Sequence, residues 1–338
     1  MHIGRSYSLF QTLSWSRRDI LLPLAWATTA TLLHEIAGFG WLALPWLPMG
    51  AIGAAVAFYL GFKNNASYDR TWEARKIWGA IVNASRSWAF SSRDLVTDLH
   101  AERAVDKGEL TVVHAELVHR HVAWMDALRH QLRKVKTWEH RGELLEKVRN
   151  ETVPERQEKL EELLSRCVSA DEAEEVLATL NPAAHLLSNQ SRRLSELRAT
   201  GWLDGFGHLA LQQQLVELMA QQGKAERIKN FPFPRQYATV NRLFAILYAL
   251  LVPFGMLDAF VELEGGSLIW LAAPFSAIVS WVFLTTDRIG DWSENPFEGL
   301  VNDVPISSMA RGIERDIRQM NGETDLPPAR APLGEILY

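Results

Sequence analysis

The chain has 338 residues, a formal net charge of -5 and a single cysteine. This length allows one large domain or two ordinary ones. The negative charge excludes a generally basic surface of the kind that binds nucleic acid. One cysteine, Cys167, excludes an internal disulfide and fits a reducing compartment.

Four segments are apolar enough to be candidates for membrane-spanning helices, at residues 20–44, 41–62, 236–260 and 265–286. The second and the fourth contain no charged residue. The first contains His34 and Glu35, and the third contains Arg242 and Asp258. Charges inside a bilayer are costly unless they face protein or water. We therefore expect His34 and Glu35 to face other helices or the outer interface.

Lysine and arginine flank these spans on one side only, at Arg17, Arg18, Lys63, Arg70, Arg75, Arg235 and Arg288. The two short connections on the other side, LPWLP and DAFVELEGG, carry neither residue. The positive-inside rule therefore predicts both termini in the cytoplasm of a multi-pass inner-membrane protein. An alternative interpretation of SRRDILLPLAWA is a cleaved twin-arginine export signal.

The predicted order is an interfacial helix (1–19), two spans (20–62), a cytosolic helical region (63–233), two more spans (234–288), and a cytosolic loop, helix and tail (289–338). Residues 47–100 predict one long helix or two nearly collinear ones, since no proline or glycine hinge occurs between the apolar run and Gly79. Residues 109–150 predict a helix by their three-to-four spacing of apolar positions, and shorter helices follow over 154–180. The sequence shows no strand-like alternation, so we expect an all-α protein.

Three stretches together resemble the bestrophin family of ion channels, in its bacterial branch, over about residues 5–325. They are LGFKNNASYDRTWEARKIWG at 60–79, FPFPRQYATVNRLFAILYALLVPF before and within the third span, and ENPFEGLVNDVPISSMARGIERDIRQM after the fourth. The resemblance implies a homopentamer with four transmembrane helices per subunit and a cytosolic helical domain around one central pore. It also implies a hydrophobic neck lined by the second span and a separate cytosolic aperture.

The neck positions of the family fall on Ala54, Phe58 and Phe62, which share one helical stripe at fourfold spacing. Small residues around them, Ala51, Gly53, Ala55 and Ala57, would let five copies approach an axis. An alternative register puts Leu47, Ala51 and Ala55 on that axis. The alternative to pore lining, for either stripe, is that these side chains contact lipid or pack in the core.

The cytosolic aperture falls, by the same resemblance, on Phe206 in LDGFGHLAL, with Gly207 or His208 as alternatives in a shifted alignment. Glycines flank Phe206, so the competing interpretation is an inter-helix loop with a buried phenyl ring. An aliphatic residue is usual there in the family, and an aromatic one would narrow the exit or alter its selectivity.

Metal and cofactor sites are not expected. Glu298, Asn302 and Asp303 stand where animal bestrophins carry a calcium clasp of consecutive acids, but Ca²⁺ takes six to eight oxygen ligands. We therefore do not expect calcium to gate this protein as the clasp of animal bestrophins would imply. His114 and His121 are seven residues apart on one predicted helix, and a tetrahedral metal site would need a further ligand.

The leading functional hypothesis is passive conduction of monovalent ions, with chloride and other anions favoured because aromatic ring edges carry partial positive charge. A sodium-conducting channel of the same fold is an alternative, since Glu262 and Glu264 near the outer mouth would concentrate cations. A membrane-anchored scaffold or sensor without conduction is another. No Ser-His-Asp set, paired catalytic carboxylates or phosphate loop indicates an enzyme. The expected partners are the bilayer, inorganic monovalent ions and further copies of the chain.

Overall fold

The computed structural model describes residues 1–101 and 106–338. In that part all the regular elements are helices. The β pairing consists of two isolated bridges, His2–Ile336 and Leu333–Ile336. The described residues form two compact units. We call residues 4–70 and 232–294 the apolar unit, and residues 1–3, 71–231 and 295–338 the charged unit. The predicted all-α class is confirmed for the described residues.

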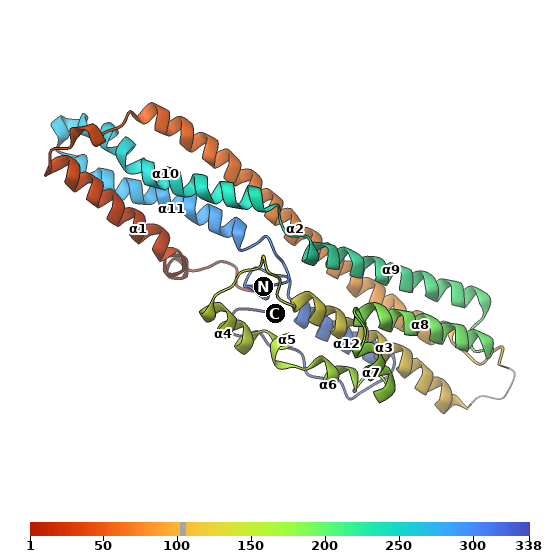
Figure 1. Ribbon diagram of the computed structural model, residues 1–338. Coiled ribbons are helices and arrows are strands. Elements are labelled where there is room, and N and C mark those ends of the chain that lie inside the picture. Colours follow the sequence, from red (N-terminus) through yellow and green to blue (C-terminus); the bar gives the residue numbers. More distant parts are fainter. Residues whose placement is uncertain (102–105) are drawn as a thin grey trace. The chain divides into compact units, whose positions relative to one another are not determined.

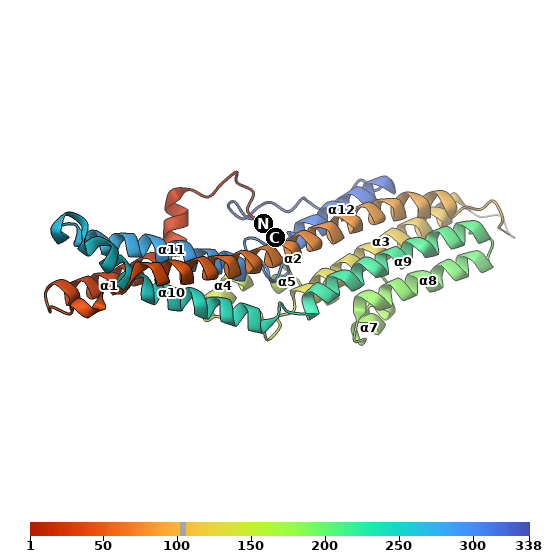
Figure 2. The same cartoon turned by 90° about the horizontal axis from the view of Figure 1, so that it is seen from above.

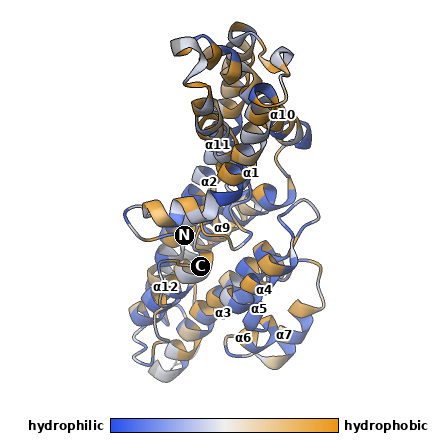
Figure 3. Ribbon diagram, turned by 90° about the vertical axis from the view of Figure 1, so that its left-hand side faces the viewer, coloured by the Kyte–Doolittle hydropathy of each residue, from blue (hydrophilic) through white to orange (hydrophobic). Residues whose placement is uncertain are grey.

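The apolar unit contains α1 (Leu9–Glu35), the first half of α2 (Trp46–Leu95), α10 (Arg235–Val261) and α11 (Ala272–Asp291). Short 3-10 turns connect them at Gly40–Leu42, Leu263–Gly266 and Ile269–Leu271. α11 packs along both α1 and α10, as Figures 1 and 2 show. The helices of this unit are mostly apolar in Figure 3, and their core includes Val56, Leu60, Tyr248 and Val252.

Three helices among the described residues are long and apolar enough to cross a bilayer, at Gly40–Leu95, Arg235–Val261 and Ile269–Asp291. The first two contain the spans that the sequence predicts at 41–62 and 236–260, and the third covers the predicted span at 265–286 from residue 269 onward. α1 is not among them, and it ends at Glu35 rather than at residue 44. It also runs without a break through residue 19, so the predicted interfacial helix is the first part of a longer one.

The helix α2 is continuous over 50 residues and belongs to both units. Its first backbone N–H, on Trp46, donates to a carboxylate oxygen of Asp258 at 2.9 Å. This contact gives one of the unsatisfied donors at the helix start an acceptor of favourable charge. The helix ends at Leu95 because the Thr97 N–H donates to the Trp202 carbonyl, at 2.9 Å, and leaves the helical ladder. The single long helix predicted over 47–100 is thus confirmed, with a slightly earlier end.

The charged unit packs the second half of α2 with seven further helices and a last one, α12. They are α3 (Lys107–Arg133), α4 (Glu143–Thr152), α5 (Pro154–Gln157), α6 (Leu160–Leu164), α7 (Ala170–Leu177), α8 (Pro182–Ala199), α9 (Gly205–Asn230) and α12 (Ile306–Met320). Three tryptophans, Trp78, Trp88 and Trp124, are fully buried in its core. Large aromatic side chains of this kind contribute much of the apolar area that a core buries.

The helix predicted over 109–150 is wrong in its middle, because α3 ends at Arg133 and α4 begins at Glu143. The intervening segment turns so that the Glu139 carboxylate becomes buried against the ammonium of Lys229. The same carboxylate accepts from the Lys136 N–H at 3.1 Å. A buried carboxylate needs such partners, and the partner lies 90 residues away in sequence.

The C-terminal tail lies along the charged unit. Arg330 donates to both carboxylate oxygens of Glu158, at 2.6 and 2.8 Å. The Leu337 N–H donates to the Met1 carbonyl at 2.9 Å, so the two termini are adjacent (Figures 1 and 2). The proline-rich tail is therefore attached to the charged unit at several points.

Candidate functional site

The stripe predicted for a pore neck lies on the uncovered face of α2. Ala54, Phe58 and Phe62 are all exposed, the two phenyl rings by 67% and 58%. Their centroids are 4.6 Å apart and the rings meet edge to face at 80°. The opposite face of the same helix, Gly53, Val56, Leu60, Lys63 and Ser67, is buried in the apolar unit. Two large apolar rings are thus displayed side by side on a face that the chain itself does not cover.

One small residue of this helix has a different role from the one expected. A Cβ at Gly53 would overlap the hydroxyl of Tyr248, so glycine here permits close packing of α2 on α10 within one chain. The expectation that Gly53 serves approach between copies is therefore wrong. Ala51 and Ala55 remain exposed, as does Leu47, so exposure alone does not separate the two registers that the sequence leaves open.

The stripe is fixed in orientation by polar contacts just after it. The Lys63 ammonium donates to the Asp287 carboxylate of α11 at 2.7 Å, with side chains only 1% and 10% exposed. The Asn64 amide donates to the Thr286 carbonyl at 3.1 Å. Gly290 leaves room for Asn64, because a Cβ there would overlap its amide oxygen. Lys63 and Asn64 of the motif at 60–79 therefore attach α2 to α11. The sequence alone did not indicate these partners.

The next charged residues of the motif also connect separate elements. Arg70 donates through Nε to the Glu294 carbonyl at 2.8 Å. The Glu294 carboxylate, 1% exposed, accepts from Arg235 at 2.6 Å. In the charged unit Glu73 pairs with Arg227 of α9. Arg70 and Glu73 thus bridge elements within their own units.

Phe206, predicted for the aperture, is the second residue of α9 and is 90% exposed. The Asp204 side chain caps this helix by accepting from the Gly207 N–H at 2.6 Å. Gly207 itself is buried, and a Cβ there would lie 2.9 Å from a methyl group of Leu203. The interpretation of Phe206 as a buried ring in a loop is therefore wrong. Of the three candidate positions, Phe206 presents the largest exposed side chain.

The acidic loop after α11 uses its carboxylates internally. Glu298 is fully buried and binds Arg149 at 2.7 Å, the His140 ring at 3.0 Å and the Asn295 amide at 2.7 Å. The Glu298 carboxylate, which a calcium ion would need as a ligand, is thus already paired with the Arg149 guanidinium.

Asp303 in the same loop accepts from the backbone N–H groups of Gly299 and Leu300, at 2.7 and 3.1 Å. Burial raises the pKa of Asp303 to about 6, although the nearby Arg133 and these two N–H groups act in the opposite direction. Asn302 is half-buried beside it. Within the described residues no three His, Cys, Asp or Glu side chains are grouped to hold a metal.

The two histidines considered as ligands have separate partners. His121 contacts the Ser85 hydroxyl at 2.8 Å between Trp88 and Trp124, and burial lowers its pKa to about 3. His114 contacts the Val96 carbonyl at 2.8 Å. Both rings therefore act as packing and hydrogen-bonding groups of the charged unit.

Comparison with known proteins decides the family. Residues 14–319 match the family model described as Bacterial/Fungal Bestrophin protein. The chain belongs to the bestrophin family. The resemblance carried by the three sequence stretches is thus confirmed.

The curated relatives of this bestrophin include two proteins named as voltage-dependent anion channel-forming. One, from Ralstonia nicotianae, is 30% identical over 290 residues, which is 86% of this chain and 82% of the relative. The other, YneE of Escherichia coli K12, is 27% identical over 285 residues, or 84% and 80% of the two chains. The solved bestrophin homologue of Klebsiella pneumoniae superposes with a TM-score of 0.75 at 25% identity, covering 91% of this chain and 99% of that one.

Proposed function

We propose that this bestrophin is an ion channel that passively conducts monovalent anions, with chloride as the physiological candidate. The observation that carries the proposal is the uncovered stripe of Ala54, Phe58 and Phe62 on a helix that is apolar in its first half and polar in its second. Such a stripe suits a neck that narrows in the membrane and opens into water. The names of the curated relatives support anions as the cargo.

The pore requires several copies of the chain, and we propose a homopentamer. One exposed stripe cannot enclose a pathway, whereas a closed ring of identical subunits repeats it around an axis. Phe58 and Phe62 would then each form a ring of phenyl groups. Rings of this kind gate by dewetting, and selectivity arises from weak contacts with the ion. Phenyl edges turned to the axis would favour a partly desolvated anion.

The proposed topology has four membrane helices, α1, α2, α10 and α11, in an inner membrane with both termini cytoplasmic. α1 packs on α11 and α10 within the apolar unit, which supports its crossing with them. Two polar side chains of α1 have partners on α11: Asp19 pairs with Arg288 at 2.7 Å, and Ser16 accepts from the Trp281 indole at 2.9 Å. Such pairing lowers the cost of charge near a membrane.

Phe206 is proposed as a second constriction at the cytosolic exit. Its phenyl ring makes little contact with its own chain, and the Asp204 cap holds it at the start of α9. A short ring of side chains at the end of a helix would select ions by size. We propose no calcium requirement, because the two carboxylates of the loop have other partners. Glu298 binds Arg149 and His140, and Asp303 accepts from backbone N–H groups.

The test is recording from purified protein in planar bilayers with asymmetric NaCl. An anion channel reverses near the chloride equilibrium potential. Reversal near the sodium equilibrium potential would instead establish the cation channel that exposed Glu262 favours. Absence of current in a correctly assembled oligomer would favour a scaffold. Native mass spectrometry tests the assembly, and a monomer or dimer as the sole stable species would contradict the pore.

A further inference from the structure

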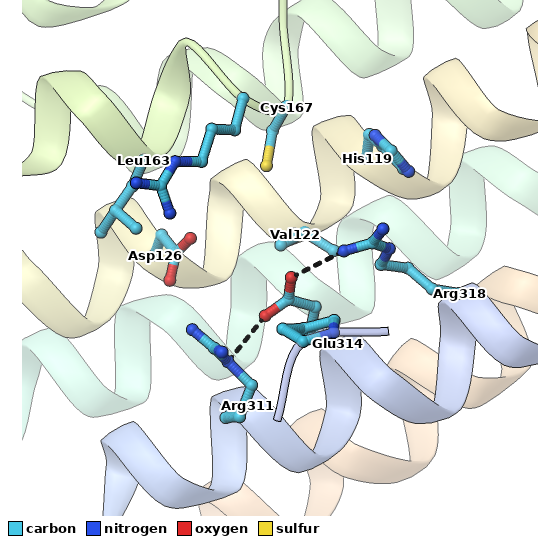
Figure 4. A pocket seen from close by; sticks show the side chains of 10 residues that line it. His119, Val122, Asp126, Leu163, Cys167, Arg311, Glu314 and Arg318 are labelled. Carbon is cyan, nitrogen blue, oxygen red and sulfur yellow. Dashed lines mark hydrogen bonds and ion pairs between the residues drawn. The ribbon is translucent and has the colours of Figure 1, made fainter. Parts of the chain in front are cut away.

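A cavity of about 280 Å³ lies within the charged unit between α3, the end of α6, α12 and the C-terminal tail (Figure 4). This volume is just below the range of about 300–1,000 Å³ typical of ligand pockets. An occupant is therefore smaller than a drug-sized molecule. The cavity is remote in sequence from the α2 stripe, and none of the residues proposed for the pore lines it.

The wall of this cavity carries one more arginine than carboxylate, and Arg318 has a further partner outside the wall, Glu323, at 2.7 Å. Three arginines line it, Arg166, Arg311 and Arg318, against two carboxylates, Asp126 and Glu314. Figure 4 shows Glu314 between Arg311 and Arg318, at 3.0 and 3.3 Å.

The remaining carboxylate is already engaged, because Asp126 binds Arg129 at 2.7 Å. The side chain of Arg166 makes no ion pair or hydrogen bond with any residue that the structure describes. Arg166 is thus available to an external acceptor, and a planar guanidinium binds carboxylates through paired hydrogen bonds.

The other lining residues are His119, whose ring is paired with Glu323 at 2.8 Å, and four side chains without charge. Val122 and Leu163 are buried, and Pro327 of the tail closes one side. Cys167 adds apolar surface rather than a reactive thiolate, since burial raises its pKa to about 12. A mostly apolar cavity with a few placed polar groups is the usual form of a small-molecule site.

The tail that covers the cavity is attached on both sides of Pro327. Arg318 donates to the Asp325 carbonyl at 2.9 Å, and Arg330 binds Glu158 through both carboxylate oxygens. The cover is therefore held in place by the protein's own contacts.

We propose that this cavity binds a small organic monoanion, a carboxylate on a short hydrocarbon body, with Arg166 as its ion-pair partner and Arg311 as a second donor. The hydrocarbon contacts Val122, Leu163 and Pro327. Inorganic anions would gain the charge contact without the apolar one. The site does not depend on ion conduction, so it stands or falls separately from the proposed channel.

The experiment is isothermal titration calorimetry of the full chain in detergent at constant ionic strength, with butyrate, inorganic phosphate and butylammonium. Butyrate should bind, phosphate should bind more weakly, and butylammonium should give no specific heat. Arg166→Gln should weaken butyrate binding about two- to fivefold, the loss expected for a charge pair made by an exposed arginine. Arg311→Gln should weaken it as well.

The matched control is Arg198→Gln in α8, which removes another exposed arginine that has no side-chain partner among the described residues. It should leave butyrate affinity unchanged. Equal affinity of Arg166→Gln and the unaltered protein would overturn the site, as would a loss in the control Arg198→Gln equal to that in Arg166→Gln. Butylammonium binding as tightly as butyrate, or phosphate binding as tightly as butyrate, would overturn the assigned ligand chemistry.

Discussion

Replacing Asp287 with alanine leaves the Lys63 ammonium without its carboxylate partner in a place where its side chain is 1% exposed. The ammonium also donates to the Asp287 backbone carbonyl at 3.4 Å, which is too long to compensate for the lost charge. Removing one member of a buried ion pair typically costs about 3–5 kcal/mol, because the remaining charge stays buried and unpaired. We expect Asp287→Ala to lose that much stability.

The double variant Lys63→Met, Asp287→Leu removes both charges and should recover most of the loss, since a buried pair replaced by apolar groups is often close to neutral. The assay is unfolding in detergent followed by tryptophan fluorescence. An exposed pair supplies the control: Arg86 and Asp316 are in contact at 2.6 Å but are 46% and 41% exposed. Asp316→Ala should cost under about 1 kcal/mol. A cost for Asp287→Ala as small as that of the control, or no recovery in the double variant, would refute the reasoning.

Phe58→Ala removes a ring that is 67% exposed in the chain, so it should raise single-channel conductance or weaken ion selectivity while the oligomer still assembles; loss of folding with no change in current would assign Phe58 to the core. Phe206→Ala should alter the permeability series for chloride and bulkier anions in bi-ionic reversal potentials, and an unchanged series would place Phe206 off the axis. Asp303→Asn tests the buried carboxyl whose pKa burial raises from 3.8 to about 6. The folded state holds this proton more tightly, so the stability that the group contributes is complete below about pH 4 and is lost as pH rises to about 6. The melting temperature of Asp303→Asn, relative to the unaltered protein, should therefore rise between pH 4 and pH 7, and a constant difference would contradict the assignment.

The long helix was predictable because its signal is local. Between the apolar run and Gly79 nothing in the sequence breaks a helix, and the structure shows no interruption over Trp46–Leu95. The exposed positions of Phe58 and Phe62 were likewise predictable, since they follow from spacing on one helix. The fold family was predictable from three separated motifs taken together.

The pairings between distant residues were not predictable from local patterns. Nothing near Lys63 in sequence indicates that its partner is Asp287, and nothing near Trp46 indicates Asp258. The turn at 134–142 has no proline. It forms because Glu139 gains a buried lysine partner from α9. Gly53 was assigned to contacts between copies because it is small, but its actual neighbour is a tyrosine of the same chain. Each of these depends on which helices come together.

The most direct test of the proposed function is the reversal potential of purified channels in a tenfold NaCl gradient, measured for the unaltered protein and for a Phe58→Ala, Phe62→Ala double variant. We expect reversal close to the chloride equilibrium potential for the unaltered protein. We expect a shift toward zero for the variant, because its neck is wider and discriminates less between ions. Reversal close to the sodium equilibrium potential, or identical reversal and conductance in the two proteins, would contradict an anion pathway lined by this stripe.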